Sequence, residues 1–336
     1  MANLVSILIP AYNKERWIQE TILSAINQTW PNKEIIVVDD GSSDNTYKVA
    51  KALESKTVKV LTQPNAGACG ARNNAFKLAQ GDYIQWLDAD DLLDPDKISS
   101  QLRIHNEGRD SRTLLTCAWS TFYYRSCKAR FIPNSLWADL GPADWIVTKF
   151  RDNVWMNPTV WLVSRRLTEL AGPWDGRLNF SGDDDGEYIC RVVAASKNVT
   201  FVQEARCYYR IGNVGSLNWG MGKSDKSLES LVLSLSLSIQ HLRSLEDSER
   251  TRIACLKYLE TWFPLFYPEK QALLARMQGL ASDLGGRLCP PRVSWKYYPV
   301  EKLLGSERTK RVRANWRESK EFMKSGWDNL LYRLTQ

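Results

Sequence analysis

Two groups of aspartates are the residues best suited to do chemistry in this sequence. Asp88 and Asp90 stand two positions apart where an apolar run stops, and three more aspartates follow one another at 183–185. Carboxylates this close repel each other unless a cation lies between them, and hard oxygen ligands suit Mg²⁺ or Mn²⁺. We therefore expect Asp88 and Asp90 to hold Mn²⁺ or Mg²⁺ together with the phosphate oxygens of a ligand.

The composition restricts which other chemistry is available. Only two histidines occur, His105 and His241, and neither has a motif context, so acid–base or metal chemistry must use carboxylates. The seven cysteines form no CxxC pair, which is typical of reduced thiols in a cytosolic protein. With no apolar run of about 18 residues and no secretory signal pattern, we expect no membrane span and a cytoplasmic location.

The elements that would position the first aspartate pair alternate between strand and helix. Short apolar runs predict buried strands at 5–9, 34–38, 58–61 and 83–87, with helices between them, which means a mostly parallel sheet with helices on both faces. Ligands bind beyond the carboxyl ends of such strands. The polar residues at 10–13, 39–42, 63–67 and 88–91 are therefore expected to meet at one edge of the sheet.

A turn rich in small residues links the third strand to its helix at 65–73. It contains only Gly67 and Gly70, so it is neither the dinucleotide GxGxxG nor a P-loop. Its amides are expected to come close to a phosphate, with Arg72 as a charged donor.

These segments resemble the inverting glycosyltransferases of family 2, which have the GT-A fold. Four motifs carry the resemblance in order, at 9–13, 34–44, 65–74 and 81–91, within a match that spans residues 4 to about 100. The resemblance implies an α/β fold of GT-A type, Rossmann-like, followed by a helical C-terminal region. It also implies a hexosyltransferase-type enzyme that uses a nucleotide-diphospho-sugar, with a UDP-sugar expected first, and a glycan or glycolipid acceptor.

The family's residue roles can be carried onto the matching positions. The resemblance implies that Asp40 accepts a hydrogen bond from the base, that Arg72 contacts the diphosphate and that Asp90 is the principal metal ligand. Asp88 would serve the ribose or complete the metal shell. The whole nucleotide-sugar site expected on this basis is Pro10, Ala11, Tyr12, Asp40, Asn65, Gly67, Arg72, Asp88 and Ala89.

A second part of the family pattern lies at 172–175 and 184–191. In the family an acidic pair precedes an aromatic residue and another acid, with an arginine six residues after the second member of the pair. Counting back six residues from Arg191 gives Asp185 as the second member of the pair. Asp185 is therefore the expected general base in a single displacement that inverts the configuration at the anomeric carbon. The run of three aspartates and Gly186 in place of the aromatic residue keep Asp184 open as the alternative.

Three regions are expected along the chain. Residues 1–112 would form the nucleotide-sugar-binding half of the GT-A domain, 113–222 its acceptor-binding half and 223–336 a helical region. Leucine spacing at 228–245 favours a helix, although 231–239 also alternates with period two, so a strand stays open.

The last 36 residues suggest a membrane partner, and two other functions stay open. Residues 301–336 carry nine Lys or Arg against five Asp or Glu, with Trp316 and Trp327 among them. A solvated tail and contact with anionic lipid at the inner face of a membrane both fit this composition. No nucleic acid partner is expected. A catalytically silent GT-A scaffold is one alternative function, and a nucleotidyltransferase, which would want a Gly-rich signature near 10–13, is the other.

Overall fold

One mixed sheet forms the centre of the molecule. The computed structural model describes residues 3–105, 110–179, 183–212, 224–290 and 323–334. Within these residues, eight strands pair in the order β3-β2-β1-β4-β7-β6-β8-β5. The strands are β1 (Val5–Ala11), β2 (Lys33–Asp39), β3 (Val58–Thr62), β4 (Tyr83–Trp86), β5 (Leu92–Leu93), β6 (Thr113–Phe122), β7 (Leu162–Ser164) and β8 (Asn198–Arg210).

The strands predicted from apolar runs are present, and they are parallel. β1 lies between β2 and β4, and β3 pairs with β2, all in parallel register. The second half of the sheet is mixed, because β7 runs antiparallel to β4 and β6, whereas β6 and β8 are parallel. Strands from 1–112 and from 113–222 therefore share one sheet.

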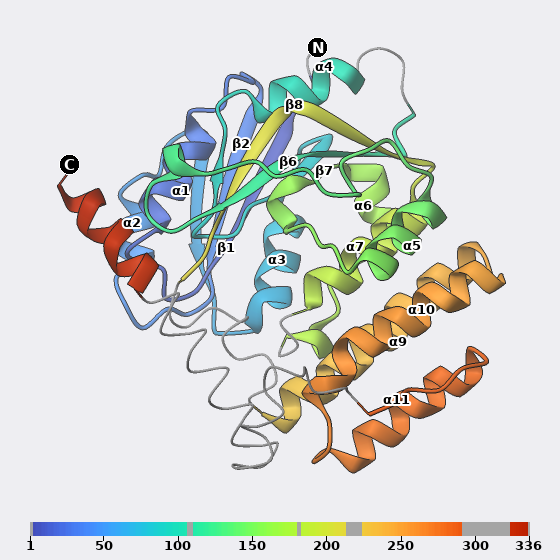
Figure 1. The fold of residues 1–336 in the computed structure, drawn as a ribbon. Helices are drawn as coiled ribbons and strands as arrows, with labels where there is room; N and C mark the ends of the chain where they lie inside the picture. Colours follow the sequence, from blue (N-terminus) through green and yellow to red (C-terminus); the bar gives the residue numbers. More distant parts are fainter. Residues whose placement is uncertain (1–2, 106–109, 180–182, 213–223, 291–322, 335–336) are drawn as a thin grey trace.

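Helices cover both faces of this sheet, as expected (Figure 1). Those of the α/β part are α1 (Ile18–Ile26), α2 (Thr46–Lys51), α3 (Gly67–Leu78), α4 (Lys97–His105), α5 (Pro142–Asp152), α6 (Arg165–Ala171) and α7 (Asp184–Ala195). Helix α3 packs on β1 and β2, and α6 packs on β4 and β7. On the opposite face α1 meets the start of α4, where the Gln28 amide donates to the Asp94 carbonyl at 2.7 Å.

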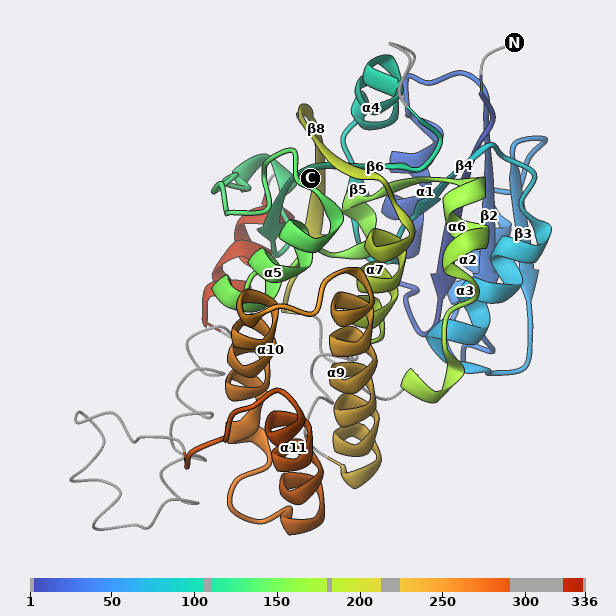
Figure 2. The same cartoon turned by 90° about the vertical axis from the view of Figure 1, so that its right-hand side faces the viewer.

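The C-terminal helices lie against the acceptor half of the sheet domain (Figure 2). They are α9 (Asp225–Leu245), α10 (Glu249–Trp262) and α11 (Gln271–Asp283), with a short 3-10 turn, η4 (Phe263–Leu265), after α10. Helix α9 packs on α7, and α10 packs on α5. The leucine-rich stretch is helical, and its apolar side chains at 228, 231, 235, 239 and 242 are buried on one face. The strand alternative for 231–239 is therefore wrong.

The sequence pattern predicts a helix at 71–79 and another that starts at Asp94-Pro95, but both helices start elsewhere. Helix α3 begins at Gly67, because that glycine has a φ of +78° and turns the chain directly into the helix. Asp94 lies before α4, which begins at Lys97, and its side chain accepts from the Asp96 amide at 3.3 Å within the preceding turn. No described helix is long and apolar enough to span a bilayer. Trp316 lies outside the described residues.

Candidate active site

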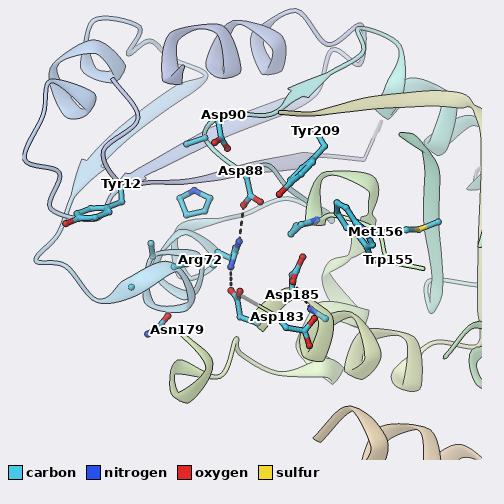
Figure 3. A pocket seen from close by; sticks show the side chains of 18 of the residues that line it. Tyr12, Arg72, Asp88, Asp90, Trp155, Met156, Asn179, Asp183, Asp185 and Tyr209 are labelled. Atoms are coloured by element: carbon cyan, nitrogen blue, oxygen red, sulfur yellow. Dashed lines mark hydrogen bonds and ion pairs between the residues drawn. The ribbon is translucent and has the colours of Figure 1, made fainter. Parts of the chain in front are cut away.

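Every residue predicted for the site lines one cavity. It has a volume of about 1100 Å³ and opens at the carboxyl ends of β1, β2 and β4, where the sequence placed the ligand. Figure 3 shows residues from both halves of the sheet domain facing into it. The predicted residues on its wall are Pro10, Ala11, Tyr12, Asp40, Asn65, Gly67, Arg72, Asp88, Ala89, Asp90, Asp184 and Asp185.

The turn before α3 is held by its own side-chain partners. Asp40 is 2% exposed and accepts from the amides of Ala66 and Gly67, each at 2.8 Å. Asn179 accepts from the Cys69 amide at 2.9 Å. The amides expected to approach a phosphate thus already donate to side chains. A side chain at Gly67 would also meet the Asn179 amide at 2.5 Å, so only glycine fits there.

The three aspartates after β4 have three different environments. Asp88 accepts from Arg72 at 3.0 Å, and Asp90 accepts from the Lys14 ammonium at 2.6 Å. Asp91 is fully buried and accepts from the Thr159 hydroxyl at 3.0 Å, which ties the end of β4 to the segment before β7. Asp88 and Asp90 line the cavity, whereas Asp91 holds the fold.

The chemistry of Asp88 and Asp90 fits a hard divalent cation. No group of three or more His, Cys, Asp or Glu side chains among the described residues is arranged to hold a metal. Mg²⁺ commonly takes only one or two carboxylates and completes its shell with phosphate oxygens and water. Both carboxylates line the cavity, Asp90 beside Lys14 and Asp88 beside Arg72, and they offer oxygen ligands of the kind that a phosphate-bound cation takes.

Arg72 joins the donor side of the cavity to the acceptor side. It is 5% exposed, and its guanidinium pairs with Asp184 at 2.6 Å as well as with Asp88. The same guanidinium lies 4.2 Å from the ring centre of Trp174, which stacks on Tyr188 at 3.8 Å. Two carboxylates and an aromatic face therefore hold the cation in place.

The aspartate triplet separates into three roles. Asp183 accepts from the Ser234 hydroxyl at 2.8 Å and from Tyr258 at 3.2 Å, which binds it to α9 and α10. Asp184 points to Arg72, while Asp185 points into the cavity (Figure 3). Among the described residues, the Asp185 carboxylate accepts a hydrogen bond only from the amide of its neighbour Gly186, at 2.9 Å.

Two local features follow from this arrangement. A side chain at Gly186 would overlap the Asp183 carboxylate, which explains why this chain has glycine where the family pattern has an aromatic residue. Burial first, and then the charges of Asp184 and Asp183, raise the pKa of Asp185 well above the usual aspartate range. A carboxyl with a raised pKa is a stronger proton acceptor once it is ionised.

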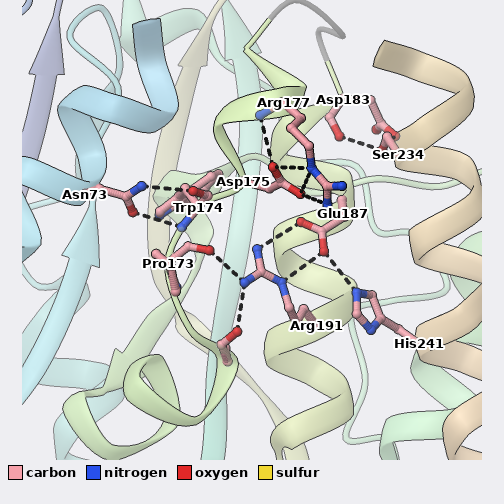
Figure 4. A network of polar contacts seen from close by, with 11 residues as sticks. Asn73, Pro173, Trp174, Asp175, Arg177, Asp183, Glu187, Arg191, Ser234 and His241 are labelled. Carbon is pink, nitrogen blue, oxygen red and sulfur yellow. Dashed lines mark hydrogen bonds and ion pairs between the residues drawn. The ribbon is translucent and has the colours of Figure 1, made fainter. Parts of the chain in front are cut away.

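A polar network fixes the helix that carries the triplet (Figure 4). Glu187 pairs with Arg191 at 2.9 Å, and His241 on α9 bonds the same carboxylate at 2.9 Å. Arg191 also donates to the Pro173 carbonyl at 2.7 Å. Burial would raise the pKa of Glu187, but the hydrogen bonds from His241 and Arg191 lower it below its usual value. The family-like arginine thus orients α7 without lining the cavity.

Sequence reasoning missed several residues of the cavity wall. Lys14 directly follows the polar cluster at 10–13, so its place at the strand end was available as a signal. Asn179, Tyr209 and Arg210 also line the cavity, but only tertiary contacts bring them there. The Arg210 guanidinium donates to the Asp90 carbonyl at 2.8 Å and so braces the aspartate loop.

Comparison with known proteins agrees with this geometry. Residues 6–148 match glycosyl transferase family 2. A UDP-Glc:alpha-D-GlcNAc-diphosphoundecaprenol beta-1,3-glucosyltransferase, WfgD of Escherichia coli, is 46% identical over 101 residues, 30% of this chain and 40% of WfgD. The hyaluronan synthase of Pasteurella multocida is 41% identical over 120 residues, 35% of this chain but only 12% of the synthase. The chain therefore spans well under half of these relatives.

Solved structures match over a longer stretch. TarS of S. aureus, residues 1–349 in complex with UDP-GlcNAc, superposes with a TM-score of 0.65 at 18% identity, covering 83% of this chain and 81% of that one. Its complex with UDP gives a TM-score of 0.64 at 17% identity, with 83% and 82% covered. At such identity the likeness establishes the fold. The fold is therefore GT-A, and residues 6–148 within it are similar to glycosyl transferase family 2.

Proposed function

We propose that the chain is an inverting, hexosyltransferase-type enzyme that moves a sugar from a UDP-sugar to an acceptor hydroxyl by a metal-dependent single displacement. The observation that supports this most is the separation of the two candidate bases. Arg72 pairs with Asp184, whereas Asp185 lines the cavity and forms no ion pair with any residue that the structure describes. The TarS complexes and the donor named for WfgD support a uridine diphosphate donor.

In this proposal the nucleoside lies beside the ends of β1 and β2, against Pro10, Tyr12 and Asp40. A carboxylate has about four acceptor positions. The Asp40 carboxylate accepts three hydrogen bonds, from the Gln63 side chain and from the amides of Ala66 and Gly67. One position therefore remains for an N–H of the base.

The transfer step is a displacement at the anomeric carbon. Asp185 accepts the proton of the acceptor hydroxyl as that oxygen bonds to the carbon, and the carbon's bond to the diphosphate breaks with its electron pair leaving on UDP. Attack opposite the leaving group inverts the configuration. Asp90 and Asp88 would hold the divalent cation, which when bound neutralises charge on the leaving diphosphate. Arg72 holds Asp88 and the acceptor motif in register.

Metal dependence gives a direct test of the donor site. We expect Mn²⁺ to strengthen UDP binding. Asp90→Asn should weaken UDP binding in the presence of Mn²⁺ by about tenfold or more, because the principal metal ligand is lost. Titration calorimetry of UDP with and without Mn²⁺ measures this. Asp96→Asn, an exposed aspartate outside the cavity, is the matched control. UDP binding that ignores Mn²⁺ would contradict the metal assignment, and no nucleotide binding at all would favour the silent scaffold.

The pH dependence of transfer tests the base. Only ionised Asp185 can accept a proton, so activity is present above its pKa and falls about tenfold per pH unit below it. Because the pKa of Asp185 is raised by burial and by Asp184, the acid limb of kcat/KM should lie well above the ordinary aspartate value. Circular dichroism over the same pH range controls for unfolding. A rate that stays flat down to about pH 4, the ordinary value, would be incompatible with Asp185 as the base.

A glycan or glycolipid acceptor and a peripheral position at the cytoplasmic face of a membrane complete the proposal. The helix at 323–333 supports it, because Met323, Trp327, Leu330 and Leu334 repeat at helical spacing and are 66%, 65%, 50% and 74% exposed. The helix is attached to the sheet domain through Asp328, which pairs with Arg125 at 2.7 Å. An exposed apolar row within a basic segment suits an anionic lipid surface.

Vesicle binding tests this contact. We expect salt-sensitive binding to vesicles containing phosphatidylglycerol, weakened about tenfold or more by Trp327→Ser with Leu330→Ser, since two apolar side chains leave the lipid. Ile253→Ser, an equally exposed apolar residue on α10, is the control. Co-sedimentation measures the bound fraction. Binding that survives both the double substitution and truncation after residue 300 would exclude the tail as the contact.

A further inference from the structure

The cavity extends past the aspartates to a second wall. We name as the acceptor wall six of the cavity residues that come from α5, from the segment after it and from α10 with η4. They are Lys149, Trp155, Met156, Tyr258, Trp262 and Leu265. These residues lie outside the four strand ends that form the donor side, and Trp155 among them is 44% exposed.

Lys149 is unusual within this wall. It lies in the last turn of α5 and is 6% exposed, yet no hydrogen bond or ion pair to its ammonium occurs among the described residues. The ammonium lies 5.0 Å from the ring centre of Tyr258 and 5.7 Å from that of Phe150. Aromatic faces stabilise a cation less than an ion pair does, and burying an ammonium is costly. Within the described part of the chain, Lys149 is therefore a buried cation without a direct hydrogen-bond or ion-pair partner, and Asp183 attracts it only through its charge.

The neighbouring carboxylates leave this cation available. Asp183 attracts Lys149 but bonds to Ser234 and Tyr258, and Asp184 pairs with Arg72. Asp185, the proposed base, lines the same cavity.

We propose that Lys149 binds an anionic group of the acceptor, a phosphate or a carboxylate, while the acceptor hydroxyl lies at Asp185. This inference rests on the proposed function, since it assigns the substrate class of that same cavity. The donor diphosphate has its own cations in Lys14 and Arg72 on the strand side. A lysine on α5, beside the C-terminal helices, is placed for the other substrate. Trp155 and Trp262 offer apolar faces for its sugar ring.

The test is binding of small anionic and neutral probes to the full chain saturated with UDP. Glucose 1-phosphate and glucuronate represent the two anions, and methyl glucoside is the neutral sugar. We expect Lys149→Met to weaken binding of one or both anions about tenfold or more, because a charge-assisted hydrogen bond is lost. Lys149→Arg should retain the affinity, and methyl glucoside should bind all variants alike. Loss for only one anion identifies the group as phosphate or carboxylate.

Controls separate this proposal from the proposed function. Lys257→Met changes the same charge on an exposed lysine of α10 outside the cavity and should leave every affinity unchanged. Equal anion affinity in the wild type and Lys149→Met, with UDP still bound, would overturn the proposal and leave the transferase intact. Failure to bind UDP would instead count against the proposed function.

A second measurement is independent of whether Lys149→Met folds. The UDP-bound wild type should prefer glucose 1-phosphate or glucuronate over methyl glucoside, and inorganic phosphate should compete with the preferred anion. A wild type that binds no anionic probe more tightly than methyl glucoside would refute the anion site.

Discussion

Asp185→Asn is expected to abolish sugar transfer while UDP still binds. The asparagine keeps the size of the side chain but cannot take the acceptor proton, and general base catalysis is worth about 10²- to 10⁴-fold. We expect kcat to fall within that range, with UDP affinity and thermal midpoint close to wild type. Steady-state kinetics with a panel of UDP-sugars measures the first quantity, and calorimetry measures the second.

Asp184→Asn is the informative partner of that variant. Asp184 pairs with the buried Arg72, so its neutralisation should lower the thermal midpoint and retain more transfer activity than Asp185→Asn. Full activity in Asp185→Asn together with an inactive but folded Asp184→Asn would reverse the assignment. The sequence pattern left these two aspartates open, and their different partners make them separable.

Arg72→Met should produce the largest loss of stability of any single change in the cavity. Arg72 is 5% exposed, and its removal leaves the carboxylates of Asp88 and Asp184 without their shared cation. Breaking a buried pair by deleting one partner costs about 3–5 kcal/mol, because a buried charge is left uncompensated. Urea denaturation of the full chain measures the change in the free energy of unfolding.

The matched control for this variant is Arg177→Met. Arg177 pairs with Asp175 at 2.6 Å, but its side chain is 66% exposed, so solvent screens the pair and its loss should barely change stability. Arg72→Lys should lose less stability than Arg72→Met, since lysine keeps the positive charge. It should still be less stable than the wild type, because an ammonium lacks the planar guanidinium that pairs with two carboxylates at once. If Arg72→Met and Arg177→Met unfold alike, Arg72 does not hold the two halves of the cavity together.

The donor side was largely readable before the structure. Its strands are short apolar runs, and each ends in polar residues such as Asp40 or Asp88. In a parallel sheet every strand points the same way, so a local pattern that marks strand ends also predicts that they meet. The sequence also shows that position 67 is a glycine. It does not show why a glycine is needed there, because the Asn179 side chain that packs against it lies far away in the chain.

The acceptor side could not be read in the same way. Which aspartate of 183–185 faces the cavity depends on contacts with residues far away in the chain, such as Arg72, which is 112 positions from Asp184. The turn amides expected for phosphate are instead used by Asp40 and Asn179, a choice made by packing. No motif in the sequence distinguishes Lys149, and its place beside Tyr258 depends on the packing of α10 against α5.

The residue types along the chain thus determined which carboxylates gather at the sheet edge and therefore which reaction class is available. Strand polarity and turn chemistry are local properties, so one segment of sequence is enough to show them. The tertiary structure alone decided how the two aspartate groups differ. Pairing and burial depend on distant partners, which bind Asp88 and Asp184 to one arginine, give Asp90 a lysine and leave Asp185 facing the cavity with its raised pKa.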